Sequence, residues 1–145
     1  MHATDARLTA AGEFWEDINK YRSLINRLGI QRHVTLINQY IPSEDVHRYF
    51  DASDVVVLPY VRCTGSGIAQ IALGCGRPVI ASAVGSLCEI IEDGKNGLLV
   101  PPADSDALAR TIVEFHRKPI VVSATDGSRF SWDNLTHQLG SLTVQ

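Results

Sequence analysis

Short apolar runs alternate along the chain with segments in which apolar residues recur at helical spacing. The runs predict strands at residues 7–11, 34–37, 54–58, 78–81 and 98–100. The helical spacing predicts helices at residues 14–28, from 43 onward, at 68–75, at 89–91, from 104 to Pro119 and, in the tail, at 132–142. Because strands and helices alternate, the pattern predicts an α/β fold with a doubly wound, mainly parallel sheet.

The strand expected at residues 54–58 consists of an aspartate followed by three valines and a leucine. Its apolar residues do not alternate with polar ones, which is typical of a parallel strand covered by helices on both faces. We therefore expect this strand to lie in the centre of the sheet.

The composition of the 145 residues, 45% hydrophobic and 20% charged, is that of one globular domain, residues 1–145. A formal net charge of −3 gives no electrostatic reason to expect nucleic acid or an anionic membrane as a partner. Cys63, Cys75 and Cys88 lack metal-ligand or CxxC spacing, and no run resembles a signal peptide. They are interpreted as half-buried small hydrophobes, with a reactive thiol at Cys63 as the alternative.

Thr64-Gly65-Ser66-Gly67 is a glycine-rich turn between the carboxyl end of an expected strand and the amino end of an expected helix. Backbone N–H groups and the helix dipole point at an incoming anion there, and small residues permit close approach. The turn is neither a GxGxxG nor a Walker motif, because it lacks the third glycine and the lysine. The alternative is structural: a tight turn that needs glycine for a positive φ and Ser or Thr as a helix cap.

The order of the surrounding runs is more specific than any one of them. They are VTL at 34–36, YIPSEDV at 40–46, YFDASDVVVLPY at 49–60, GCGRPVIAS at 74–82, VGSLCEII at 84–91 and DGKNGLLVPP at 93–102. In this order the chain resembles the C-terminal, donor-binding domain of GT-B-type retaining glycosyltransferases (glycosyl transferases group 1), which use nucleotide sugars. The resemblance covers nearly the whole chain and implies the Rossmann-like half of a GT-B fold.

The resemblance implies that the turn from Cys63 to Gly67 wraps the sugar and the diphosphate of the donor. The resemblance implies that two glutamates of the family are replaced here by Cys63 and Ile71. Neither of these residues accepts hydrogen bonds as a carboxylate does. Gln70 is the adjacent polar residue, and members with a Ser-Gly turn are similar to this chain. The expected donor- and phosphate-binding residues are Arg62, Cys63, Thr64, Gly65, Ser66, Gly67, Ile68, Gln70, Ile71 and Glu89.

Some of these residues have a second interpretation. Arg62 faces a phosphate or is an exposed loop arginine, and Glu89 lies near the phosphates or stabilises a helix N-terminus electrostatically. Ile37, Asn38 and Gln39 correspond loosely to family backbone that meets the nucleobase. The resemblance implies no metal ion and no cofactor, and it names no catalytic residue in this chain.

The chain begins at what resembles the second strand of the family's donor domain. The first strand and its helix, with the basic residues that neutralise the diphosphate, have no counterpart, and neither has the N-terminal acceptor-binding domain. We therefore expect the donor-binding half of a glycosyltransferase, a hexosyltransferase fragment that is inactive until an N-terminal domain or a separate chain completes it. The alternative is a non-catalytic, glycosyltransferase-like remnant that acts as an interaction or nucleotide-binding module.

Three smaller expectations complete the picture. A homodimer is predicted through the sheet edge that the missing strand leaves open. The location is expected to be cytoplasmic, or peripheral to a membrane through the missing domain. The tail, residues 123–145, is expected to form a C-terminal helix that packs on the domain. Trp15 and Trp132 are expected to pack in the core or at its edge, with an exposed surface for the missing domain as the alternative.

Overall fold

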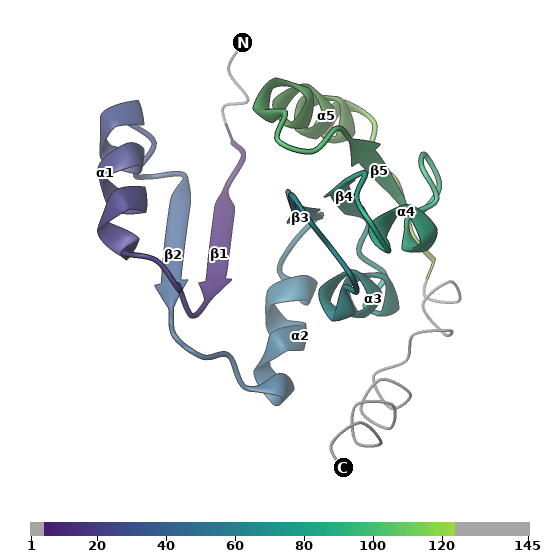
Figure 1. Ribbon diagram of the computed structural model, residues 1–145, viewed down its shortest axis with the longest axis horizontal. Coiled ribbons are helices and arrows are strands. Elements are labelled where there is room, and N and C mark those ends of the chain that lie inside the picture. Colours follow the sequence, from purple (N-terminus) through teal and green to yellow (C-terminus); the bar gives the residue numbers. More distant parts are fainter. Residues whose placement is uncertain (1–4, 124–145) are drawn as a thin grey trace. The chain divides into compact units, whose positions relative to one another are not determined.

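The computed structural model of the chain describes residues 5–123. These residues fall into two compact units, unit 1 within Met1–Val46 and unit 2 within His47–Gln145. Each unit is built from parallel strands joined by helices (Figure 1). The predicted α/β fold with parallel strands is therefore confirmed.

Unit 1 contains β1 (Leu8–Gly12), α1 (Ile18–Leu28) and β2 (Val34–Asn38). The strands pair in parallel over their whole length, from Leu8 opposite Val34 to Gly12 opposite Asn38. None of the three elements has a buried residue. Unit 1 thus presents a two-stranded sheet whose apolar side chains stay partly accessible to water.

The start of α1 differs from the helix predicted at residues 14–28. Asp17 is extended, and its side chain accepts a hydrogen bond from the N–H of Asn19 at 3.0 Å, so the helix begins at Ile18. Phe14 lies before the helix, and its ring meets Tyr21 edge-on with 5.5 Å between the ring centroids. Trp15 is 99% exposed, so of its two interpretations packing is wrong and exposure is what the structure shows.

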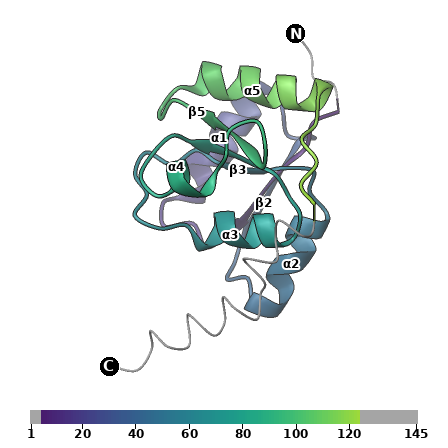
Figure 2. The ribbon, with the colours of Figure 1, turned by 90° about the vertical axis from the view of Figure 1, so that its right-hand side faces the viewer.

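Unit 2 holds the remaining strands and helices, and α2 (Ser43–Asp51) spans the boundary between the units. Along the chain they are β3 (Val56–Leu58), α3 (Gly67–Gly74), β4 (Val79–Ser82), α4 (Leu87–Ile90), β5 (Gly97–Val100) and α5 (Ser105–Arg117). The strands form one parallel sheet in the order β3-β4-β5. In Figure 2, α5 and α3 lie on opposite faces of this sheet.

The core of unit 2 is centred on β4, in which every residue is buried. On one side Ile80 packs with Val100 of β5 and Phe115 of α5. Helix α3 contributes three buried residues to the core, Ala69, Ala72 and Leu73. A strand with helices on both faces is buried at every position, which is the pattern seen in β4.

The strand predicted at residues 54–58 was expected in the centre of the sheet, and this prediction is wrong for the described residues. It is β3, at the edge of the three-stranded sheet, and β4 holds the middle. An apolar strand sequence indicates that helices cover the faces of the strand. It does not indicate whether other strands pair with both of its edges. The helix predicted at residues 132–142, with the rest of the tail and Trp132, lies outside the described residues.

Candidate functional site

The glycine-rich turn joins β3 to α3, and Ser66 fixes its end. Ser66 is extended, and its Oγ accepts a hydrogen bond from the N–H of Ala69 at 3.2 Å. The residue is 6% exposed, so this cap is shielded from water. The predicted helix cap is therefore confirmed, and it leaves the N–H groups of Gly67 and Ile68 ahead of the first intrahelical bond.

Gly65 and Gly67 do not have the positive φ that the structural interpretation of the turn requires. A Cβ atom at either position would meet no heavy atom within 4 Å. The backbone therefore does not require glycine at these two positions. What the glycines do provide is open space in front of the N-terminus of α3, where the helix dipole attracts an anion.

A second loop, from β4 to α4, lies against this turn. Gly85 has a φ of +49°, and a Cβ there would overlap the carbonyl oxygen of Cys63. The Sγ atom of Cys63 is 3.6 Å from the Oγ of Ser86. Because both loops follow the carboxyl ends of adjacent parallel strands, they form one site at the edge where α/β sheets bind ligands.

Tyr60 lies next to Cys63 and Ser66 of the turn, and sequence reasoning assigned it no role. Its hydroxyl is hydrogen-bonded to Ser66, so one network joins Tyr60, Ser66 and the first turn of α3. Burial raises the pKa of the Tyr60 phenol, the nearby Cys63 raises it further, and the hydrogen bond with Ser66 lowers it. The signal in the sequence was its position, two residues after the end of the predicted strand.

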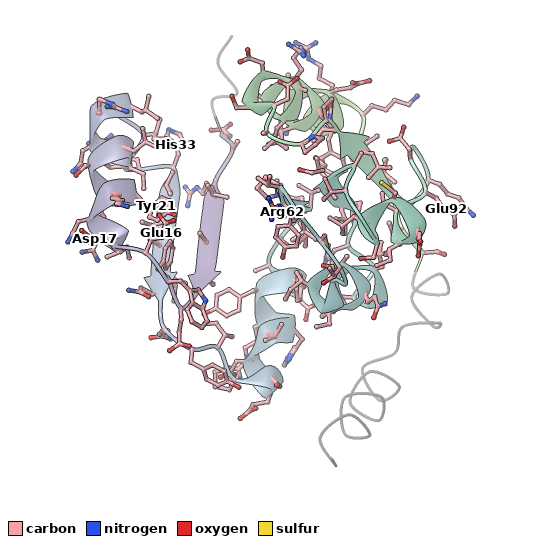
Figure 3. The ribbon with its side chains drawn as sticks, viewed as in Figure 1. Glu16, Asp17, Tyr21, His33, Arg62 and Glu92 are labelled. Carbon is pink, nitrogen blue, oxygen red and sulfur yellow. The ribbon has the colours of Figure 1, made fainter. Side chains whose placement is uncertain are left out.

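The structure brings the predicted residues of unit 2 together around these two loops. Figure 3 shows Arg62 on the segment that follows β3. Five of the turn residues are exposed, namely Arg62, Thr64, Gly65, Gly67 and Ile68. Three further residues are half-buried, namely Cys63, Gln70 and Ile71. Glu89 is exposed and lies in the first turn of α4.

Three of the predicted residues belong to unit 1, at the end of β2. They are Ile37, Asn38 and Gln39, the positions expected to meet a nucleobase. The Oδ1 of Asn38 accepts a hydrogen bond from the N–H of Phe14 at 3.0 Å, so this side chain holds the loop after β1. Their role toward a nucleobase stays a prediction.

Arg77 is half-buried at the end of α3 that is opposite the turn. Its Nη2 donates a hydrogen bond to the carbonyl oxygen of Asp51 at 3.2 Å. The guanidinium group thus ties the last residue of α2 to the segment after α3, within unit 2. Of the cysteines, Cys63 and Cys75 are half-buried as expected, but Cys88 is exposed. Burial, and then the charge of Asp51, raises the pKa of Cys75, and Arg77 lowers it.

Residues 5–123 contain no group of three or more His, Cys, Asp or Glu side chains placed to hold a metal ion. Within the same residues, no helix combines the length and the apolar composition that crossing a membrane requires. What the site offers a ligand is an uncharged cradle: backbone N–H groups, hydroxyls and open space, with Arg62 as its nearest cation in sequence. Such a cradle suits an anion with several oxygen acceptors.

Comparisons with known proteins give the site a family context. The model of the family "Glycosyl transferases group 1" matches residues 1–128. A D-inositol 3-phosphate glycosyltransferase of Corynebacterium glutamicum is 35% identical over 129 residues, which is 84% of this chain and 30% of that protein. An uncharacterized glycosyltransferase of Methanocaldococcus jannaschii is 29% identical over 92% of this chain and 36% of its own length. The chain thus spans about a third of these relatives.

Solved structures agree with this match. Sucrose-phosphate synthase from Thermosynechococcus elongatus superimposes with a TM-score of 0.72 at 29% identity, over 93% of this chain and 36% of that one. Anabaena HepE, solved in complex with UDP-glucose, gives a TM-score of 0.73 at 23% identity, over 94% of this chain and 40% of its own. The chain therefore belongs to the group 1 glycosyl transferase family, within which it corresponds to the C-terminal domain of the retaining GT-B enzymes.

Proposed function

We propose that the chain is the donor-binding half of a glycosyltransferase that transfers a sugar from a nucleoside-diphosphate sugar. The diphosphate lies against the N-terminus of α3, between the turn from Cys63 to Gly67 and the loop at Gly85. Cleavage of the bond between the sugar and the diphosphate leaves negative charge on the diphosphate oxygens. N–H groups and the dipole of α3 are oriented in advance to stabilise that charge.

One observation carries this proposal: the space at the turn before α3 is open among residues 5–123, although the backbone there does not require glycine. A Cβ atom at Gly65 or Gly67 would meet no heavy atom of these residues within 4 Å. The pattern fits a turn in which glycine makes room for a ligand. The relatives add support. One is named a D-inositol 3-phosphate glycosyltransferase, and HepE was solved in complex with UDP and with UDP-glucose.

The chain alone is proposed to be inactive. Transfer requires that the acceptor be held against the donor, and positioning of this kind contributes a large share of a catalytic rate. The chain spans about a third of its curated relatives, so the acceptor site is assigned to a domain or chain beyond it. No residue among 5–123 is assigned to the chemical step itself.

A second candidate function is a non-catalytic binding module. Cys63 and Ile71 stand where the family resemblance places two carboxylates, and both are half-buried. The thiol of Cys63 faces Ser86 at 3.6 Å, so this position holds two loops together. A module of this type would keep the diphosphate cradle and bind the sugar weakly.

Calorimetric titration with UDP, GDP and ADP tests both candidates. We expect one nucleotide to bind, and Gly67→Val to abolish the heat, because the new side chain fills the cradle without meeting protein atoms. Ala109→Val introduces the same valine side chain on the exposed face of α5, far along the chain, and serves as the control. No binding at millimolar nucleotide would overturn the proposal. Binding of the nucleotide with no gain from an attached sugar would favour the non-catalytic module.

A further inference from the structure

Tyr60 and Ser66 place two hydroxyl groups next to each other at the start of α3, and one hydrogen bond joins them. The Oγ of Ser66 also accepts the N–H of Ala69 at 3.2 Å. Each hydroxyl carries one proton, and only one of the two protons can lie between the two oxygens. Neither hydroxyl has a further partner among residues 5–123. The pair therefore holds one proton that no acceptor in the described part of the chain takes.

Burial indicates which of the two hydroxyls holds the spare proton. Ser66 is 6% exposed, so a proton turned away from Tyr60 on that side chain would meet little water. Tyr60 is only half-buried. Both groups are satisfied when Ser66 donates to the oxygen of Tyr60 and the phenol proton turns to the accessible side. Burial also raises the pKa of the Tyr60 phenol, so the group keeps this proton at neutral pH.

The phenol lies at the turn that forms the cradle, within unit 2. It is hydrogen-bonded to Ser66 at one end of the turn, and it interacts electrostatically with Cys63 at the other end. The turn between them borders open space, because a Cβ atom at Gly65 or Gly67 would meet no heavy atom of the described residues within 4 Å. A phenol at this place adds a side-chain donor to the backbone N–H groups of the cradle.

We propose that the hydroxyl of Tyr60 donates a hydrogen bond to a diphosphate oxygen of the bound sugar nucleotide. The inference rests on the proposed function, because it takes a nucleoside diphosphate as the ligand of the cradle. It adds a binding residue at a position to which the sequence gave no role. A hydrogen bond to a charged oxygen is stronger than one between neutral groups, so the loss of this hydroxyl should be measurable.

Calorimetric titration of the full chain with UDP, GDP and ADP tests the inference. We expect Tyr60→Phe to weaken binding of the nucleotide that the wild type binds by about tenfold. The same loss is expected with UDP-glucose, GDP-glucose or ADP-glucose, because the bond reaches the diphosphate and not the sugar. Tyr49→Phe removes another half-buried phenol of unit 2, on α2, and is the matched control that should bind as the wild type does.

Two measurements separate a direct bond from support of the helix cap. Ser66 still accepts the N–H of Ala69 in Tyr60→Phe, so hydrogen exchange at this amide should stay at the rate of the wild type. In wild-type chain labelled with carbon-13 at the Cζ atoms of tyrosine, the resonance of Tyr60 should shift when the nucleotide is added. The resonance of Tyr49 should stay in place.

Four outcomes would overturn the inference and leave the proposed function intact. They are an unchanged affinity of Tyr60→Phe, a loss of affinity seen only with the sugar nucleotide, a Tyr60 resonance that does not respond to the nucleotide, and faster exchange at Ala69 that matches the loss of affinity. The last result would mean that Tyr60 acts only through the cap. A wild-type chain that binds none of the nucleotides would overturn both the proposed function and this inference.

Discussion

Units 1 and 2 are built from the same parallel β-α-β connection, but only unit 2 closes a core around it. Every residue of β4 is buried, whereas β1, α1 and β2 contain no buried residue. The difference follows from coverage: α3 and α5 lie on opposite faces of the sheet of unit 2 (Figure 2), while α1 is the sole helix between β1 and β2. A parallel sheet needs cover on both faces before its apolar residues leave water.

The largest expected effect on stability comes from a substitution in the core, which only unit 2 has. Ile80→Ala in β4 removes a side chain that is 1% exposed, and we expect it to lower the free energy of unfolding of unit 2 by about 2–5 kcal/mol. The matched change in unit 1 is Leu24→Ala, which removes an isomeric side chain that is 41% exposed and should cost about 1 kcal/mol or less. Urea titrations with probes in each unit measure both values, and equal costs would contradict the comparison.

The next effect concerns the two loops of the site. Gly85→Ala forces a Cβ against the carbonyl of Cys63 at a φ of +49°, so we expect a loss of about 2 kcal/mol or more. Gly65→Ala on the facing turn meets nothing within 4 Å, and its cost should stay within about 0.5 kcal/mol. Thermal unfolding of the two variants decides the point. A neutral Gly85→Ala would mean that the loops do not touch.

How much of this could be predicted from the sequence differs between the same two units. In unit 2 the apolar runs and the glycine turns located every described strand, because burial on both faces leaves a continuous apolar signal. The start of α1 in unit 1 was missed, since Phe14 fits the helical spacing although Asp17 provides the cap. Spacing reports which face is apolar, and capping decides where a helix begins.

The candidate site was predicted in location and only in part in detail. Ser66 was foreseen as a cap, but the reason for Gly65 and Gly67 was not a positive φ. The close approach of Gly85 to the carbonyl of Cys63 joins two residues that are distant in sequence. The hydrogen bond between Tyr60 and Ser66 joins two residues whose types gave no signal in the sequence. Contacts of that kind depend on how the strands are ordered, which a linear pattern does not specify.

A smaller effect separates the helix caps of the two units. Ser66→Ala should cost about 1 kcal/mol in unit 2, because the lost hydroxyl leaves a shielded N–H of Ala69 without its acceptor. Asp17→Ala in unit 1 removes an exposed cap whose N–H turns to water, and we expect a few tenths of a kcal/mol. Hydrogen exchange at the first turns of α3 and α1 compares them directly. Thr64→Ala, which removes an exposed hydroxyl from the same turn, is the control and should change neither value.

The smallest effect is a pH dependence of the stability of unit 2. The raised pKa of Tyr60 means that the folded state favours the neutral phenol, so its contribution to stability is complete below the ordinary value of 10.0. That contribution is lost as the pH rises through the higher pKa of the folded state.

The stability of the wild type should therefore fall relative to Tyr60→Phe above pH 10.0, in urea titrations that follow unit 2. Tyr40→Phe, which removes a phenol that is 67% exposed in unit 1, is the control. Cys75 titrates in all three proteins, so its own raised pKa cancels from the comparison. A constant difference between the wild type and Tyr60→Phe would show that burial does not raise the pKa of the Tyr60 phenol in the folded state.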